Sequence, residues 1–151
     1  MTIYLLDVNM LLALSDPMHI HHVAAHRWFA ATGQPAWASC PITENGFVRI
    51  ASHPSYPNRP GDAPAVLELL RQFCAVGGHH FWAADISLRD MLRPATLLSH
   101  SQLTDVFLLG LAVHHSGKLA TLVQRIATMA ISGGSATHLS VADAEWSLSQ
   151  R

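Results

Sequence analysis

Three acidic residues, spread along the sequence, have the context of a shared site. Asp7 directly follows the apolar segment 3–6, and Glu44 comes shortly after a second apolar segment at 36–39. Asp105 opens a long apolar helical pattern. Carboxylates that meet in one place repel each other, so three together require a cation. Oxygen ligands of this kind suit Mg²⁺ or Mn²⁺, which take a few carboxylates and keep several waters.

Asp7 is the most unusual of these acids because of the strand that precedes it. Residues 3–6 (Ile-Tyr-Leu-Leu) lack polar alternation, which is typical of a strand buried on both faces in a parallel sheet. Ligands bind outside the carboxyl ends of such strands. An ionised carboxylate there is costly unless it is paired or bound to metal. The alternative is a structural role, in which Asp7 closes the strand by accepting backbone N–H groups.

The elements that must position these acids alternate between strand and helix. We predict short strands at 3–6, 36–39, 80–83, 118–121 and 137–141. Helices are predicted at 9–14, 19–31, from Pro41 onward, 64–76, 85–92 and 104–115. This alternation favours one α/β domain over residues 1–151, with a five-strand, mostly parallel sheet and helices on both faces. Asp7 and Glu44 then lie at the carboxyl edge of the sheet, and Asp105 reaches that edge if its helix starts there.

The composition is that of a globular protein. Half of the 151 residues are hydrophobic and 13% are charged, which excludes a disordered chain. The net charge of −1 excludes a broad electrostatic grip on nucleic acid, so any such contact must be local. No apolar run approaches the roughly 20 residues that cross a bilayer, and we expect a soluble, cytoplasmic protein. Cys40 and Cys74 lack metal-ligand spacing and are expected to be free thiols.

Four segments, taken in order, resemble PIN-domain proteins, and most closely the VapC-type toxin ribonucleases of bacterial toxin–antitoxin pairs. They are residues 4–9 (YLLDVN), 41–44 (PITE), 103–112 (LTDVFLLGLA) and 114–121 (HHSGKLAT). The resemblance covers nearly the whole chain. It implies a PIN-like three-layer fold, cleavage of RNA by hydrolysis, a cognate antitoxin as partner and a two-fold homodimer.

The resemblance also implies roles for individual residues. Asp7, Glu44 and Asp105 would be the catalytic metal ligands, with Asn9 and Thr104 supporting them. Candidate contacts to the RNA backbone are two arginines, whose forked guanidinium groups suit phosphate, and a histidine just before the third acid. These residues are Arg49, Arg125 and His100.

One position departs from the family pattern. Similar proteins usually carry another aspartate just after the fourth strand, where this chain has Val123. Valine cannot ligate metal, so we expect weaker metal binding and no secure second ion. Three explanations follow: a natural variant that works with three acids, a degenerate dimer that binds RNA or antitoxin without cutting, or an introduced substitution.

Two other kinds of site are weaker interpretations. The active site of haloacid-dehalogenase-like phosphatases also includes an Asp at the end of a buried strand. Such a site needs a second Asp two residues later, where this chain has Asn9. His19, His22 and His26 can line up on one helix face, and two of them have the four-residue spacing of a zinc motif. The motif also needs a Glu beside the first of that pair, where Val23 stands. We expect these histidines to be solvated or to face a partner.

Overall fold

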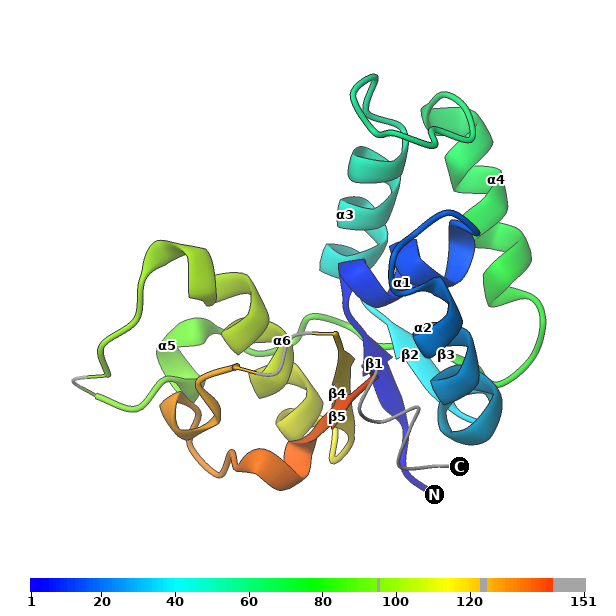
Figure 1. Ribbon diagram of the computed structural model, residues 1–151. Coiled ribbons are helices and arrows are strands. Elements are labelled where there is room, and N and C mark those ends of the chain that lie inside the picture. Colours follow the sequence, from blue (N-terminus) through cyan, green and yellow to red (C-terminus); the bar gives the residue numbers. More distant parts are fainter. Residues whose placement is uncertain (95, 123–124, 143–151) are drawn as a thin grey trace.

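The computed structural model describes residues 1–94, 96–122 and 125–142, and a parallel sheet runs through its centre (Figure 1). Within these ranges the sheet has five strands in the order β3-β2-β1-β4-β5, with every neighbouring pair parallel. The strands are β1 Tyr4–Leu6, β2 Trp37–Ser39, β3 His79–Phe81, β4 Lys118–Thr121 and β5 Leu139–Val141. The predicted five-strand α/β fold is confirmed, and the sheet is parallel throughout.

Strand β1 occupies the middle of the sheet. Leu5 pairs with Ala38 of β2 on one side and with Leu119 of β4 on the other. From β1 the chain moves through β2 to β3, and it then returns to the opposite side of β1 as β4. The carboxyl end of β1 is therefore a topological switch point, which is where open α/β sheets bind their ligands.

Helices cover both faces of the sheet, as expected for three layers (Figure 1). The two faces carry separate hydrophobic cores, one containing Leu6 and Trp37 and the other containing Leu5, Ala38 and Leu119. The first core is covered by α1 Val8–Ser15, α2 His22–Trp28, α3 Pro41–Ala51 and α4 Ala63–Cys74. The second is covered by α5 Leu88–Met91 and α6 Leu103–His114.

Two predicted helices differ from the observed ones for local reasons. The helix expected at 19–31 is regular only over α2, and Phe29–Gly33 continue it as a π-helical turn. Gly33 lies against the Trp28 ring, where a Cβ atom would come within 2.5 Å of the ring carbons. The helix expected at 85–92 begins only at Leu88, because the Ser87 hydroxyl caps it by accepting the Arg89 N–H at 3.1 Å.

Short 3₁₀ turns complete the described chain. They span His100–Gln102, Thr128–Ala130 and Ala136–His138. The first turn leads directly into α6, so it sets the position of the first turn of that helix, which carries Asp105. None of the helices in the described ranges has the length and apolar character needed to span a bilayer.

Candidate active site

Asp7 is fixed by both of its neighbours in the fold. It caps α1, and its Oδ1 accepts the Met10 backbone N–H at 2.8 Å. Its Oδ2 accepts the hydroxyl of Thr121, the last residue of β4, at 2.6 Å. Only 3% of Asp7 is exposed. A single carboxylate therefore ties the end of β1 to the start of α1 and to the end of β4.

Asp7 and Asp105 share the carboxyl edge of the sheet. Burial raises the pKa of Asp7 to about 6, against the lowering effect of its two hydrogen bonds. The charge of Asp105 raises that pKa further, so the two carboxylates are near enough to interact. Asp105 lies half-buried in the first turn of α6, and burial raises its pKa as well.

This pair has the chemistry of a cation site. Burial disfavours ionisation of both acids, the charge of Asp105 adds to this effect at Asp7, and a bound divalent ion would reverse that preference. Their donor atoms are carboxylate oxygens, which fit Mg²⁺ or Mn²⁺. That Asp7 and Asp105 together bind a metal ion stays a prediction, consistent with the effect of the Asp105 charge on the pKa of Asp7.

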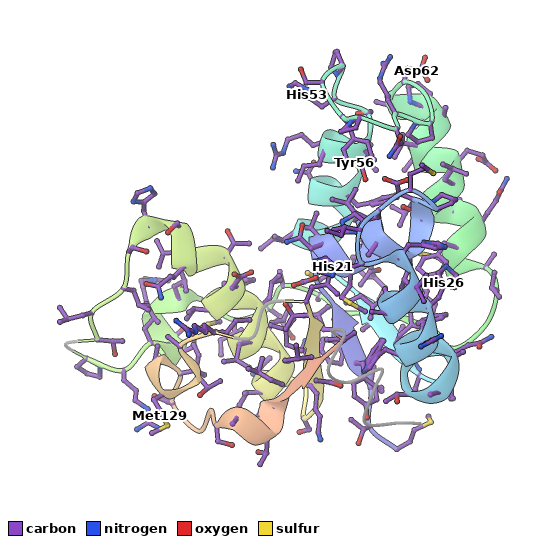
Figure 2. All side chains as sticks on the ribbon, in the orientation of Figure 1. His21, His26, His53, Tyr56, Asp62 and Met129 are labelled. Atoms are coloured by element: carbon purple, nitrogen blue, oxygen red, sulfur yellow. The ribbon has the colours of Figure 1, made fainter. Side chains whose placement is uncertain are left out.

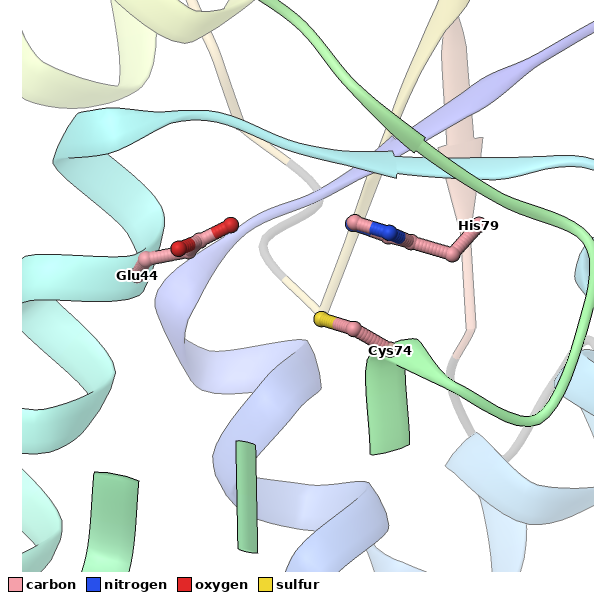
Figure 3. A group of neighbouring side chains, drawn as sticks. All are labelled: Glu44, Cys74 and His79. Atoms are coloured by element: carbon pink, nitrogen blue, oxygen red, sulfur yellow. The ribbon is translucent and has the colours of Figure 1, made fainter. Parts of the chain in front are cut away.

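Glu44 has a different set of neighbours. It lies in the first turn of α3, and its Oε2 accepts the Ser39 hydroxyl at 2.5 Å. The same hydroxyl is 2.8 Å from Nε2 of His79. Figure 3 shows the Glu44 carboxylate extending toward His79 and Cys74. One potential ligand atom from each of these three residues lies within 4.8 Å of the other two.

The three predicted metal ligands are therefore not all gathered in one cluster. Among the residues that the structure describes, the groups whose ligand atoms lie within 4.8 Å of one another do not include the set Asp7, Glu44 and Asp105. Two of the acids are together, while the third is held by Ser39 on the face covered by α3 and α4.

Cys74 and His79 were missed as candidate ligands by sequence reasoning. Burial raises the pKa of the Cys74 thiol to about 11, and the Glu44 charge adds to that effect. Burial lowers the pKa of His79, with Glu44 opposing the shift. The signal that could have paired them is the turn at Gly77 and Gly78, which joins the end of α4 to the start of β3.

The remaining predicted site residues are all exposed. They are Asn9, Thr104, Arg49, Arg125 and His100. Asn9 and Thr104 lie in the first turns of α1 and α6, beside the acid that each was expected to support. Val123 lies outside the described residues.

Arg49 is near the end of α3 that lies away from the sheet. It is five residues beyond Glu44, which corresponds to about 7.5 Å along a helix axis. It lines a hollow with His53 and Tyr56, two residues labelled at the far end of α3 in Figure 2. Arg49 is therefore well removed along α3 from the carboxyl edge of the sheet.

The histidines of α2 hold that helix to α1. Nδ1 of His22 is 2.7 Å from the Ala13 carbonyl, and Nε2 of His26 is 3.0 Å from the Leu14 carbonyl. His26 is labelled on α2 in Figure 2. These bonds satisfy carbonyl groups at the end of α1. His26 is exposed, as expected of a solvated histidine, while the partly buried His22 is turned toward α1.

Curated proteins are similar to the chain over most of its length. It is 42% identical to Ribonuclease VapC44 of Mycobacterium tuberculosis over 137 residues, which cover 89% of this chain and 96% of that protein. Ribonuclease VapC38 of the same species is 44% identical over 129 residues, covering 83% and 89%. Ribonuclease VapC39 is 37% identical over 136 residues, covering 85% and 94%. No protein-family model matches the chain.

Proposed function

The chain belongs to the VapC ribonuclease family, and we propose that it is a toxin endoribonuclease whose activity depends on a divalent metal ion. Relatives 37–44% identical over most of the chain are named as ribonucleases. The observation that carries the proposal is the position of the buried Asp7 carboxylate at the switch point of the sheet, where the charge of Asp105 reaches it. RNA is then the substrate.

Asp7 and Asp105 would hold the ion, Mg²⁺ or Mn²⁺, with Glu44 as the third acid. A bound ion of this kind lowers the pKa of a coordinated water and stabilises the charge that builds up on the phosphate. Because Mg²⁺ keeps several of its waters, Glu44 can act through one of them. Val123, where similar proteins carry an aspartate, supports weak metal binding and a single ion.

The chain's own residues supply position and charge. Met10 and Thr121 fix the two oxygens of Asp7, and they leave each oxygen a further lone pair. Asn9 and Thr104 would support the acids from the adjoining helix turns. Arg49, Arg125 and His100, all exposed, would contact phosphates of the RNA.

Membership of the VapC family also supports a proposal about the proteins that this chain binds. We propose a cognate antitoxin that blocks the site, a two-fold homodimer and action in the cytoplasm. The exposed arginines give an antitoxin segment with acidic side chains a way to compete with RNA phosphates.

Cleavage of a quenched fluorescent RNA, with Mg²⁺, Mn²⁺ or EDTA, tests the proposal. We expect cleavage with either metal, none with EDTA, and a loss of about 10²-fold or more in Asp7→Ala and Asp105→Ala. Glu68→Gln, which removes a carboxylate from the exposed face of α4, is the matched control and should cleave normally. RNA binding without cleavage in either metal would instead indicate the degenerate binding protein.

A further inference from the structure

A second group of metal-ligating side chains lies on the face of the sheet covered by α3 and α4. Cys74 ends α4, His79 begins β3, and Glu44 comes from the first turn of α3 (Figure 3). One potential ligand atom from each lies within 4.8 Å of the other two, and all three residues are partly buried. The group is therefore sheltered but still reachable from solvent.

The donor atoms of this group differ from those of Asp7 and Asp105. Sulfur, imidazole nitrogen and a carboxylate oxygen together favour Zn²⁺ and similar ions over Mg²⁺. Metal–ligand bonds of this kind place tetrahedral ligand atoms about 3.3 to 3.8 Å apart. Separations within 4.8 Å thus require only a small closure of the side chains.

The backbone brings Cys74 and His79 together through a turn that only glycine fits. Gly77 and Gly78 have φ values of 104° and 75°, in the left-handed region. A Cβ atom on Gly78 would lie 2.2 Å from the Gln34 carbonyl oxygen. The end of α4 and the start of β3 are consequently held close by the packing of the turn.

Side chains also orient two of the ligands. The buried Ser39 hydroxyl bonds both Glu44 and His79, so it already holds them side by side. The ring of Trp37 lies 4.6 Å from that of His79, centroid to centroid. An ion would replace Ser39 as the group that joins the carboxylate to the imidazole.

We propose that Glu44, Cys74 and His79 bind Zn²⁺ or a similar thiophilic divalent ion, and that this ion inhibits the enzyme by holding Glu44 away from Asp7 and Asp105. Binding releases the thiol proton of Cys74 to solvent. The inhibition rests on the proposed function, in which Glu44 is the third catalytic acid. Because Glu44 belongs to both proposed sites, an ion bound with Cys74 and His79 competes with the catalytic ion for its carboxylate.

Binding is tested first, with Co²⁺ as a spectroscopic probe. Wild-type protein should develop a thiolate-to-cobalt charge-transfer absorption that Zn²⁺ abolishes. Cys74→Ser should lose this absorption, and His79→Ala should bind about tenfold more weakly or worse. Cys40→Ser and His80→Ala, which change the other thiol and the next histidine of β3, are matched controls and should bind as wild type does. A wild-type protein without the absorption, or Cys74→Ser that retains it, overturns the site.

A second measurement avoids dependence on the folding of a ligand variant. In Cys40→Ser the only thiol is Cys74, because the chain has two cysteines. Zn²⁺ should slow alkylation of that thiol, measured by mass spectrometry, by about tenfold or more. Equal alkylation rates with and without Zn²⁺ contradict the site.

Inhibition is tested by the ratio of RNA cleavage with and without Zn²⁺, at constant excess Mg²⁺. Zn²⁺ should slow RNA cleavage by the wild type about tenfold or more, and it should leave the cleavage rate of Cys74→Ser nearly unchanged. Equal Zn²⁺ inhibition in both proteins overturns the inhibitory role. If cleavage is absent in every metal while Co²⁺ still binds, the proposed function and the inhibition both fail, and the metal site stands.

Discussion

The Thr121 hydroxyl donates a 2.6 Å hydrogen bond to Oδ2 of Asp7, across 114 residues of sequence. This bond helps to hold a carboxylate that is almost completely buried. It also fixes the direction in which the Asp7 carboxylate would face the proposed metal ion. Residues that orient a metal ligand in this way typically change metal affinity by 10- to 100-fold when they are replaced.

Thr121→Val removes the hydroxyl and keeps the shape of the side chain. We expect the Mg²⁺ concentration for half-maximal RNA cleavage to rise about tenfold or more, because Asp7 loses its orienting partner. Titration of Mg²⁺ against cleavage rate measures this. Thr137→Val, in an exposed 3₁₀ turn, is the control. An unchanged Mg²⁺ requirement in Thr121→Val would show that the bond is only structural.

The stability of the metal-free protein should depend on pH through Asp7. Its pKa rises from 3.8 to about 6 on folding, so the folded state holds the proton more tightly than the unfolded state. The free energy of unfolding therefore falls as pH rises from about 4 to about 6, and it stays lower above that range.

Asp7→Asn should remove this pH-dependent loss of stability, because the side-chain amide does not ionise. At pH 7.5 in EDTA we expect the variant to be about 1 to 3 kcal/mol more stable than wild type. Below pH 4 that advantage should vanish. Urea unfolding at several pH values gives the comparison, and parallel pH profiles for the two proteins would contradict the assignment.

Val123→Asp introduces the acid that the family resemblance leads us to expect at this position. The added charge should strengthen metal binding and raise cleavage at low Mn²⁺ by about tenfold. Gln124→Asp adds the same charge one residue later and serves as the matched control. Equal Mn²⁺ titrations for wild type and Val123→Asp would show that three acids suffice.

Arg125→Ala tests the proposed phosphate contact. We expect weaker RNA binding across all sequences, and a slope of log affinity against log salt that is smaller by about one unit. Binding to RNA in EDTA, measured at several salt concentrations, separates this effect from cleavage. Arg71→Ala, an exposed arginine on α4, is the control. An unchanged salt slope would exclude Arg125 from the RNA interface.

The central strand and its acid were predictable because their signals are local. An unbroken apolar segment followed by Asp7 predicts a buried strand with a polar group at its carboxyl end. The start of α6 was equally predictable from the sequence, because Asp105 comes at the beginning of a long apolar helical pattern. These two features led to the prediction that the two acids lie at the same edge of the sheet.

The direction of Glu44 was not predictable in the same way. It depends on the Ser39 hydroxyl beneath it and on His79, which reaches Ser39 only through the pairing of β2 with β3. Cys74 joins them because of a glycine turn packed against Gln34. Such contacts come from the packing of separate elements, and no periodicity in the sequence encodes them.

The position of β1 between β2 and β4 has a consequence for synthesis on the ribosome. The strand that carries Asp7 is synthesised before its partner β4, which ends at Thr121. Asp105 also follows Asp7 by nearly a hundred residues, so a nascent chain that has just produced Asp7 has neither the second acid nor the neighbouring strand. The carboxyl edge of β1 can therefore assemble only after residue 121 has been added, 114 residues after Asp7.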